Sequence, residues 1–140
     1  MKYENRLSDI DKLQDQITGT AFEPPSPSEV PRLIQSFIDE LPSLKRQHPV
    51  ECAATLHIRL ATIHPFVDGN GRTARLLMNL ALLQAGYPIT IIPPLLRGDY
   101  IAGIREANKG ISQPFVDFIS TCVWESQREY RRLLGSLDRE

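Results

Sequence analysis

Apolar residues recur with helical spacing along most of this chain, and prolines and glycines separate the repeats. The proline-rich run 24–27 excludes a helix interior, whereas Ser28 suits an N-cap and Pro31 suits a first helical turn. The pattern therefore predicts a helix over about 29–41, followed by a connection over 42–47.

The strongest helical patterns lie in the middle of the chain. Pro49 opens a pattern that runs to about residue 63, and Pro65 stops it. A third helix is predicted over about 71–85, with Gly86 as its C′ residue. Because leucine occupies much of its circumference, we expect this third helix to be the central and most buried one.

The remaining segments complete an all-α pattern. Residues 89–92 are β-branched but flanked by prolines, which favours an extended crossing over a paired strand. Further helices are predicted over about 99–108 and 114–134, and a short amphipathic helix over 3–13. Residues 16–22 place β-formers around a glycine and are interpreted as a small hairpin or an extended flap.

Composition adds a few exclusions to this picture. A chain of 140 residues is most simply one domain, and its 16 basic and 17 acidic residues nearly cancel, so we expect no nucleic-acid partner. No apolar run is long enough to cross a bilayer, and the N-terminus lacks a secretory signal. Cys52 and Cys122 have no metal-type spacing and are interpreted as buried thiols, so the expected location is the cytoplasm.

Residues 64–75 hold the densest chemistry in the chain. The first backbone N–H groups of a helix have no intrahelical partner, so Gly69, Asn70 and Gly71 are suited to hold a phosphate at the start of the third helix. Arg72 and Arg75 lie one turn apart and are suited to clamp outer phosphates.

Two further residues of this stretch suit catalysis. Asp68 is an acceptor for Mg²⁺, and His64 is a candidate general base. Each feature taken singly is more typical of a connection, but their combination within twelve residues favours function. Phe66 is interpreted as a core anchor that fixes the loop.

Other chemically suggestive residues are given structural interpretations. His57 is expected to be a hydrogen-bonded core residue rather than a metal ligand with Asp68. Phe115, Phe118 and Trp124 follow helical spacing and are expected in the core. His48 is interpreted as a cap or a surface residue, and the charges over 125–132 as a solvated face with i,i+4 pairs.

The stretch 64–75 has the form His-Pro-Phe-x-Asp-Gly-Asn-Gly-Arg-x-x-Arg, which resembles the signature of Fic-domain proteins at every defined position. The resemblance extends over about residues 15–135. It implies an all-α Fic fold, a bundle of about five to seven helices around a buried central helix with a short N-terminal β-flap. The chain would form a single Fic domain over 1–140, with 1–14 as an N-terminal helix or the remnant of a longer N-terminal region.

The resemblance also implies an activity: transfer of AMP from ATP to a hydroxyl side chain of a target protein, with release of pyrophosphate. His64 would be the base, Asp68 would hold Mg²⁺, and the residues Gly69 to Gly71 would bind the α and β phosphates. Arg72 and Arg75 would contact the outer phosphates.

Two regions outside the motif acquire roles by the same resemblance. Tyr100 lies in the region that usually closes over the nucleobase. The flap that lines up the target chain by strand addition falls on the segment made of Gln16, Ile17, Thr18 and Gly19.

Alternatives stay open within the family. The phosphorylating Doc-type members carry lysine at the position of Gly71, which favours nucleotidyl transfer here. Transfer of UMP, phosphocholine or phosphate, or a nucleotide- or partner-binding module with little catalysis, are the other candidates.

Many family members also carry a self-inhibitory helix of the form Ser/Thr-x-x-x-Glu-Gly/Asn. The two nearest matches here, 36–41 and 121–126, both lack the final residue. We therefore expect inhibition by an antitoxin-like partner, by self-association or by a region outside this chain.

Overall fold

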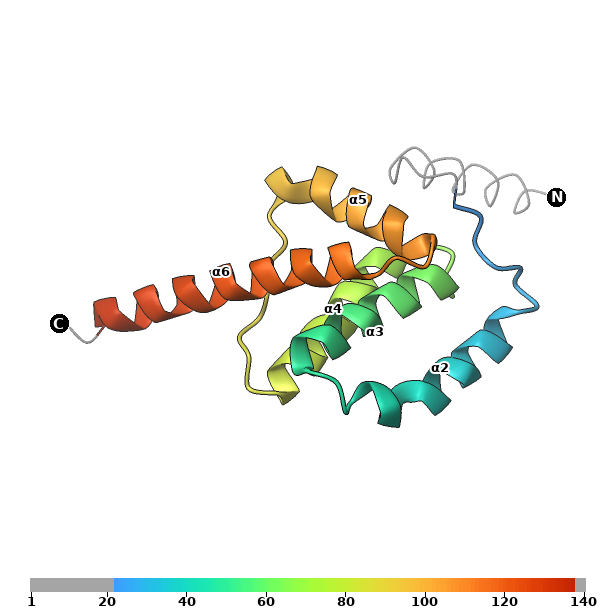
Figure 1. Ribbon diagram of the computed structural model, residues 1–140, viewed down its shortest axis with the longest axis horizontal. Coiled ribbons are helices and arrows are strands. Elements are labelled where there is room, and N and C mark those ends of the chain that lie inside the picture. Colours follow the sequence, from blue (N-terminus) through green and yellow to red (C-terminus); the bar gives the residue numbers. More distant parts are fainter. Residues whose placement is uncertain (1–21, 138–140) are drawn as a thin grey trace.

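The computed structural model describes residues 22–137, and every regular element in that range is helical (Figure 1). This confirms the all-α prediction for the described range. The predicted helix over 3–13 and the predicted flap at Gln16, Ile17, Thr18 and Gly19 lie outside it. The elements are α2 (Val30–Leu44), α3 (Pro49–Ile63), α4 (Asn70–Gln84), the 3₁₀ turn η1 (Pro94–Leu96), α5 (Arg97–Asn108) and α6 (Gln113–Leu137).

Local signals set most of the helix ends where the sequence places them. His48 accepts a hydrogen bond from the Val50 N–H through Nδ1 at 3.3 Å, so it caps α3. Gly86 and Gly110 follow α4 and α5 in left-handed conformations, with φ of 86° and 88°. Residues 87–93 form no strand, as expected for an extended crossing.

The two ends of α2 differ from the prediction. Glu29 rather than Ser28 is the N-cap residue, and its carboxylate accepts bonds from the Ser26 hydroxyl (2.8 Å) and N–H (3.1 Å). These bonds lower the pKa of Glu29. The helix also continues through Pro42 to Leu44, because burial of Leu44 compensates for the helical hydrogen bond that proline cannot donate.

The central helix is α3, so the prediction that α4 would be the most buried helix is wrong. Helix α3 packs against α2, α4, α5 and α6, and Ala53 and Ala54 are fully buried where the neighbouring helices approach closely. Helix α4 packs mainly against α3 and leaves its outer face exposed. Leucine content alone did not reveal this, because burial depends on how many neighbours surround a helix.

Two apolar clusters hold the helices together, one on each side of α3. One cluster joins α3 and α4 to α6, with side chains of α5 packed against it. Its buried members are Val50, Ala53, Ala54, Ile58, Met78, Leu82, Phe115, Val116, Ile119 and Val123. The other joins α2, α3 and α4 through Phe37, Leu44, Cys52, Leu56, Leu60, Ile63 and Ala74.

Helix α6 is buried only in its first half and then projects beyond the bundle (Figure 1). Phe115 is fully buried and Phe118 packs against the same cluster, as predicted, but Trp124 is 56% exposed, so its assignment to the core is wrong. Every residue from 128 to 137 is exposed. Cys52 and Cys122 are buried free thiols, as expected.

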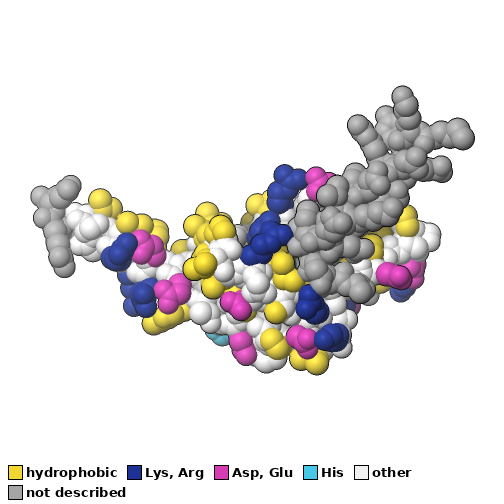
Figure 2. Space-filling model, turned by 90° about the horizontal axis from the view of Figure 1, so that it is seen from above, with side chains coloured by type: hydrophobic (Ala, Val, Ile, Leu, Met, Phe, Trp, Pro, Cys, Tyr) yellow, Lys and Arg dark blue, Asp and Glu magenta, His cyan; other side chains and the backbone are white. Residues whose placement is uncertain are grey.

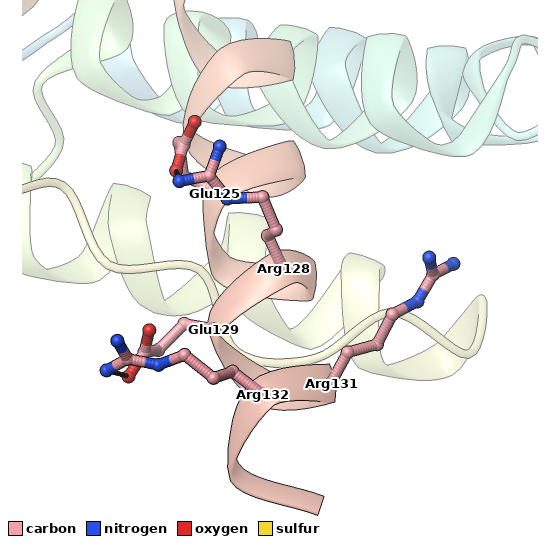
Figure 3. Close-up of a pocket in the computed structure, with 5 residues that line it drawn as sticks. All are labelled: Glu125, Arg128, Glu129, Arg131 and Arg132. Carbon is pink, nitrogen blue, oxygen red and sulfur yellow. Dashed lines mark hydrogen bonds and ion pairs between the residues drawn. The ribbon is translucent and has the colours of Figure 1, made fainter. Parts of the chain in front are cut away.

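The described surface mixes both signs of charge, as the face in Figure 2 shows. The charged stretch of α6 forms ion pairs between Arg128 and Glu125 (3.4 Å) and between Arg132 and Glu129 (2.8 Å), with i,i+3 spacing rather than the predicted i,i+4 spacing (Figure 3). All five side chains that line the hollow in Figure 3 come from this one exposed helix, so it is a helix surface and not a built site. Within the described range no helix has the length and apolar composition needed to cross a membrane.

Candidate active site

His64 ends α3 in a strained backbone conformation. It is the C-cap residue with φ 54° and ψ 53°, and the only non-glycine residue with positive φ between residues 22 and 137. Such a conformation costs on the order of 1–3 kcal/mol and occurs often at functional sites. It turns the chain sharply into Pro65 while the His64 N–H still donates to the Leu60 carbonyl at 3.0 Å.

The imidazole of His64 lies near the backbone of Ala61 and the ring of Phe22. Nδ1 lies 3.4 Å from the Ala61 carbonyl oxygen, and the Phe22 ring centroid lies 6.5 Å from that of His64. When Nδ1 carries the proton it donates to Ala61, and Nε2 is then the basic nitrogen. Phe22 is a site residue that the sequence did not suggest, because 42 positions separate it from the histidine.

Asn70 closes the loop between α3 and α4. Its Oδ1 accepts a hydrogen bond from the Phe66 N–H at 2.9 Å, and its Nδ2 donates to the Phe66 carbonyl at 2.6 Å. Asn70 is 2% exposed, whereas the Phe66 side chain is 49% exposed. The loop is therefore fixed by the asparagine, and the prediction that Phe66 would anchor it in the core is wrong.

The start of α4 is open to an anion. No side chain caps this helix end, and Gly69, with φ 85°, is its N-cap residue. The N–H groups of the first helical residues have no intrahelical partner, and the helix dipole adds positive potential there. A Cβ at Gly71 would meet no atom within 4 Å, so the space beside its backbone can accept a phosphate oxygen.

Asp68 and Arg72 face each other beside this helix start. The carboxylate of Asp68 accepts the Gly69 N–H at 2.7 Å through Oδ1 and pairs with Arg72 Nη2 at 3.3 Å through Oδ2. Both side chains are about three quarters exposed, at 76% and 75%, so the pair is weak and easily exchanged for a ligand. Arg75, one turn further along α4, is exposed as well.

A magnesium ion fits Asp68 only with help from a substrate. Among residues 22–137 no three His, Cys, Asp or Glu side chains gather to hold a metal by themselves. Mg²⁺ commonly takes one or two carboxylates together with phosphate oxygens and water, which matches a single exposed carboxylate beside an anion-binding helix end. This donor set is consistent with the predicted role of Asp68.

Tyr100 is placed beside His57 rather than in an open cleft. The Tyr100 hydroxyl lies 3.1 Å from His57 Nε2, and its ring packs against Phe115 and Phe118. Burial raises the pKa of Tyr100, while the charges of Arg75 and Arg97 oppose that rise. A contact between Tyr100 and a nucleobase stays a prediction.

His57 is the hydrogen-bonded core residue that the sequence suggested. It is fully buried, and burial lowers its pKa to about 4, an effect to which the positive charge of Arg75 adds. The imidazole is therefore neutral at cellular pH. The positive charge of Arg75 therefore acts on both His57 and Tyr100, and it lowers the pKa of each.

A second contact fixes α5 near the histidine end of α3. Thr62 Oγ1 donates to Asn108 Oδ1 at 3.3 Å, two residues before His64. Asn108 was not a candidate from the sequence, since nothing in a local pattern relates residues 46 positions apart. The last turn of α5 thus lies beside the end of α3 that carries His64.

The glutamates of the two near-matches to an inhibitory helix form ion pairs with other residues. Glu40 forms an ion pair with Arg59, and Glu125 pairs with Arg128 on the projecting part of α6. Both interactions bind these carboxylates to arginines other than Arg75. The interpretation of both near-matches as ordinary helix residues is consistent with these contacts.

Comparison with known proteins gives concordant results. The family described as Fic/DOC matches residues 2–82. The protein adenylyltransferase Fic of Drosophila willistoni is 50% identical over 112 residues, which cover 79% of this chain and 22% of that protein. The protein of the same name from Drosophila grimshawi is 48% identical over 141 residues, covering 87% of this chain and 29% of the relative.

Solved structures show the same fold. A Fic domain containing signaling protein from Bacteroides thetaiotaomicron superposes with a TM-score of 0.71 at 34% identity, covering 75% of this chain and 47% of that one. Fic-1 (residues 134–508) from C. elegans gives 0.70 at 37% identity, covering 81% and 34%. The chain spans less than a third of the two Drosophila relatives. With its motif, its helical architecture and these similarities, the chain belongs to the Fic/DOC family.

Proposed function

We propose that this chain carries the catalytic core of a protein adenylyltransferase, which transfers AMP from ATP to a Ser, Thr or Tyr hydroxyl of a target protein. The observation that carries the proposal is the pairing of His64, at the end of α3, with the uncapped start of α4 across one short loop that Asn70 closes. Relatives about half identical to this chain are named protein adenylyltransferases.

The chemistry follows from the positions of these groups. His64 accepts the proton of the target hydroxyl through Nε2, and the hydroxyl oxygen attacks the α-phosphorus of ATP. The bond from the α-phosphorus to the bridging oxygen breaks, and pyrophosphate leaves. The unpaired N–H groups at the start of α4 stabilise charge on the phosphate oxygens, and Arg72 and Arg75 bind the outer phosphates.

Asp68 would hold Mg²⁺ in this proposal, and the bound ion would neutralise charge on the phosphates. Its ion pair with Arg72 would then be exchanged for contacts of both residues to the nucleotide. Tyr100 is proposed to approach the nucleobase from α5, and Gln16, Ile17, Thr18 and Gly19 to align the target chain.

Regulation and location are part of the same proposal. Because Glu40 and Glu125 are engaged with Arg59 and Arg128, we propose that a separate antitoxin-like protein or a second copy supplies any carboxylate that blocks Arg75. We propose a cytoplasmic protein, on the basis of its two buried free thiols.

The reaction class can be read from the position of a radiolabel. The chain is incubated with Mg²⁺, cell lysate and ATP that is labelled either at the α or at the γ phosphate. Adenylyl transfer predicts protein labelling from the α-labelled nucleotide alone. Labelling from γ-labelled ATP alone would indicate phosphoryl transfer, and tight ATP binding without any labelling would indicate a binding module.

The identity of the transferred group is tested by competition. Excess unlabelled UTP or CDP-choline should leave the α-labelling from ATP nearly unchanged if ATP is the preferred donor. The names of the relatives favour AMP over UMP, phosphocholine or phosphate.

A further inference from the structure

A groove of about 320 Å³ lies between the first half of α6, the start of α3 and the segment after α4. The carboxylates of Glu51 and Asp117 line it, and no described residue of its lining is a lysine or an arginine. The ring of Trp124, more than half exposed, lines it as well. Negative charge beside an exposed indole suits a partner that brings a cation together with apolar side chains.

One face of α6 continues from this groove onto the projecting half of the helix. Five of the α6 residues that line the groove follow one another in steps of four and three, which is the spacing of a single helix face. They are Gln113, Asp117, Ser120, Trp124 and Gln127. The same steps lead on to Arg131 and Leu134, which are both exposed. The groove and the projecting half therefore present one continuous face.

The charges of this face lack partners within the described chain. Arg128 and Arg132 form ion pairs with glutamates one turn before them, whereas Arg131 points away from both pairs (Figure 3). Among residues 22–137 neither Arg131 nor Asp117 forms an ion pair, and Asp117 accepts only a hydrogen bond from the Gln113 amide at 2.8 Å. One cation and one carboxylate on the same face are thus left for a partner.

We propose that a second copy of this chain packs on this face, with the two α6 helices antiparallel and a two-fold axis at Trp124. In a two-fold interface, residue i of one copy meets residue j of the other and the reverse contact also forms. Asp117 and Arg131 lie seven residues to either side of Trp124. This register therefore places each Asp117 opposite Arg131 of the second copy, and the two indoles meet on the axis. The face is complementary to itself, which favours a second copy over another protein.

The same register covers the projecting half of α6. Trp124 lies one residue from the middle of Gln113–Leu137, so the helices overlap over nearly their whole length, roughly 35 Å. Residues 128–135 of one copy then lie against 113–120 of the other. Leu134, exposed in the single chain, enters the groove of the second copy beside Val50 and Tyr87. Burial of these apolar side chains stabilises the pair.

The pairing is independent of the proposed transfer reaction. Glu51 lies in the first turn of α3, and His64 follows the last turn, so the helix separates the groove from the candidate base by roughly 20 Å. Both copies would keep their sites accessible. Failure of the proposed function would leave this inference standing, and the reverse also holds.

Light scattering of the whole chain at rising concentration tests the pairing without enzymatic activity. The molar mass should rise from 15.8 kDa to twice that value. Arg131→Asp places two carboxylates opposite each other and should raise the dissociation constant of the pair at least about tenfold, as should Asp117→Arg with two cations. The double variant exchanges the charges and should return to within about threefold of the unmodified chain. Arg132→Asp, on the ion-paired face, is the control and should leave the constant unchanged.

Trp124 also provides an internal probe, because it is the only tryptophan in the chain. Its indole is exposed in the single chain and would be covered in the pair. Its fluorescence emission should therefore move to shorter wavelength as the concentration rises. At the same concentrations, Arg131→Asp should keep the emission of an exposed indole.

Three results would overturn the proposal. One is a molar mass of a single chain throughout the concentration series, up to about 1 mM, which is the affinity of a very weak complex. Another is a pair that Arg132→Asp weakens as much as Arg131→Asp does, or that the double variant fails to restore. The third is formation of the pair without any change in the emission of Trp124, which would place the interface elsewhere.

Discussion

At the scale of single residues, the motif separates into groups that build the site and groups that are left for a ligand. Asn70 belongs to the first group. Both the oxygen and the nitrogen of its side-chain amide form hydrogen bonds with the backbone of Phe66, and its side chain is buried. Gly71 is left open, since no atom lies near the position a Cβ would take. The two residues are adjacent, yet substitutions at them should act on different properties.

Replacing Asn70 should damage the fold. Asn70→Ala leaves the polar groups of Phe66 without their partners, and we expect a loss of about 1–3 kcal/mol in the free energy of unfolding. Unfolding in denaturant measures this loss of stability. Asn108→Ala, which removes a single longer bond to Thr62, is the control and should cost clearly less. Equal losses in the two variants would contradict the structural role of Asn70.

Replacing Gly71 should damage function without damaging the fold. Gly71→Ala places a methyl group in the space proposed for a phosphate oxygen, and alanine is the better helix former. We expect an unchanged or slightly higher melting temperature and roughly tenfold weaker binding of ATP, since tenfold corresponds to about 1.4 kcal/mol. Calorimetric titration with ATP measures the binding. Unchanged affinity would show that phosphate lies elsewhere.

His57 should make stability depend on pH. Its folded-state pKa of about 4 lies below its unfolded value of 6.5, so the unfolded chain binds the proton more readily. The contribution of neutral His57 to the free energy of unfolding is fully present above pH 6.5. It is lost as the pH falls towards 4, by up to about 3 kcal/mol. Unfolding of wild type and His57→Gln between pH 7 and pH 4 should converge at the acid end. A constant difference in the free energy of unfolding between the two proteins across that pH range would contradict this account.

At the scale of elements, the placement of α5 depends on close contact with α6. Gly103 is buried, and a Cβ there would lie 3.0 Å from Phe115 Cδ2 and 3.3 Å from Phe115 Cα. Two polar contacts, from Tyr100 to His57 and from Asn108 to Thr62, then fix α5 on α3. Close packing at Gly103 therefore helps to fix the positions of Tyr100 and Asn108.

Two glycines of α5 provide a matched comparison. Gly103→Ala should destabilise the fold by about 1–3 kcal/mol, because the added methyl group would crowd both the ring and the backbone of the fully buried Phe115. Gly98→Ala, in the same helix but with no atom within 4 Å, should be neutral or stabilising by up to about 1 kcal/mol. Thermal unfolding of both variants provides the test. A stabilised Gly103→Ala would mean that α5 does not pack as closely as described.

Local signals explain why helix ends were predictable while the choice of central helix was not. Pro49, Pro65 and Gly86 act on the backbone within one turn, and α3 and α4 begin and end within one residue of their predicted limits. The burial of α3 depends instead on four neighbours that come from distant parts of the chain. Tertiary contacts likewise extended α2 past Pro42.

The same distinction applies to the site. The twelve-residue motif identified the candidate base, carboxylate and arginines, since all are contiguous in sequence. The contacts of Phe22 with His64, of Asn108 with Thr62 and of Tyr100 with His57 join residues at least 42 positions apart. No spacing rule relates residues so far apart, so only the fold could reveal these contacts.

At the scale of the whole molecule, one short connection organises the proposed chemistry. Helix α3 runs through the centre of the bundle and ends at the strained His64, and α4 starts after a loop held by Asn70. The bundle surrounds α3 and buries one face of α4, and the loop over residues 64–69 joins the end of α3 to the start of α4. The core thus fixes the proposed base and the proposed anion-binding helix end relative to each other.

The three histidines of this chain allow the central claim to be tested directly. The measurement is the initial rate of transfer from α-labelled ATP to protein, alongside ATP affinity, for His64→Ala and His48→Ala. Loss of a general base typically costs about 10²–10⁴-fold in rate, so His64→Ala should lose transfer to that extent while still binding ATP, and His48→Ala should retain it. Transfer by His64→Ala at the wild-type rate would contradict the assignment of the base and the function built on it.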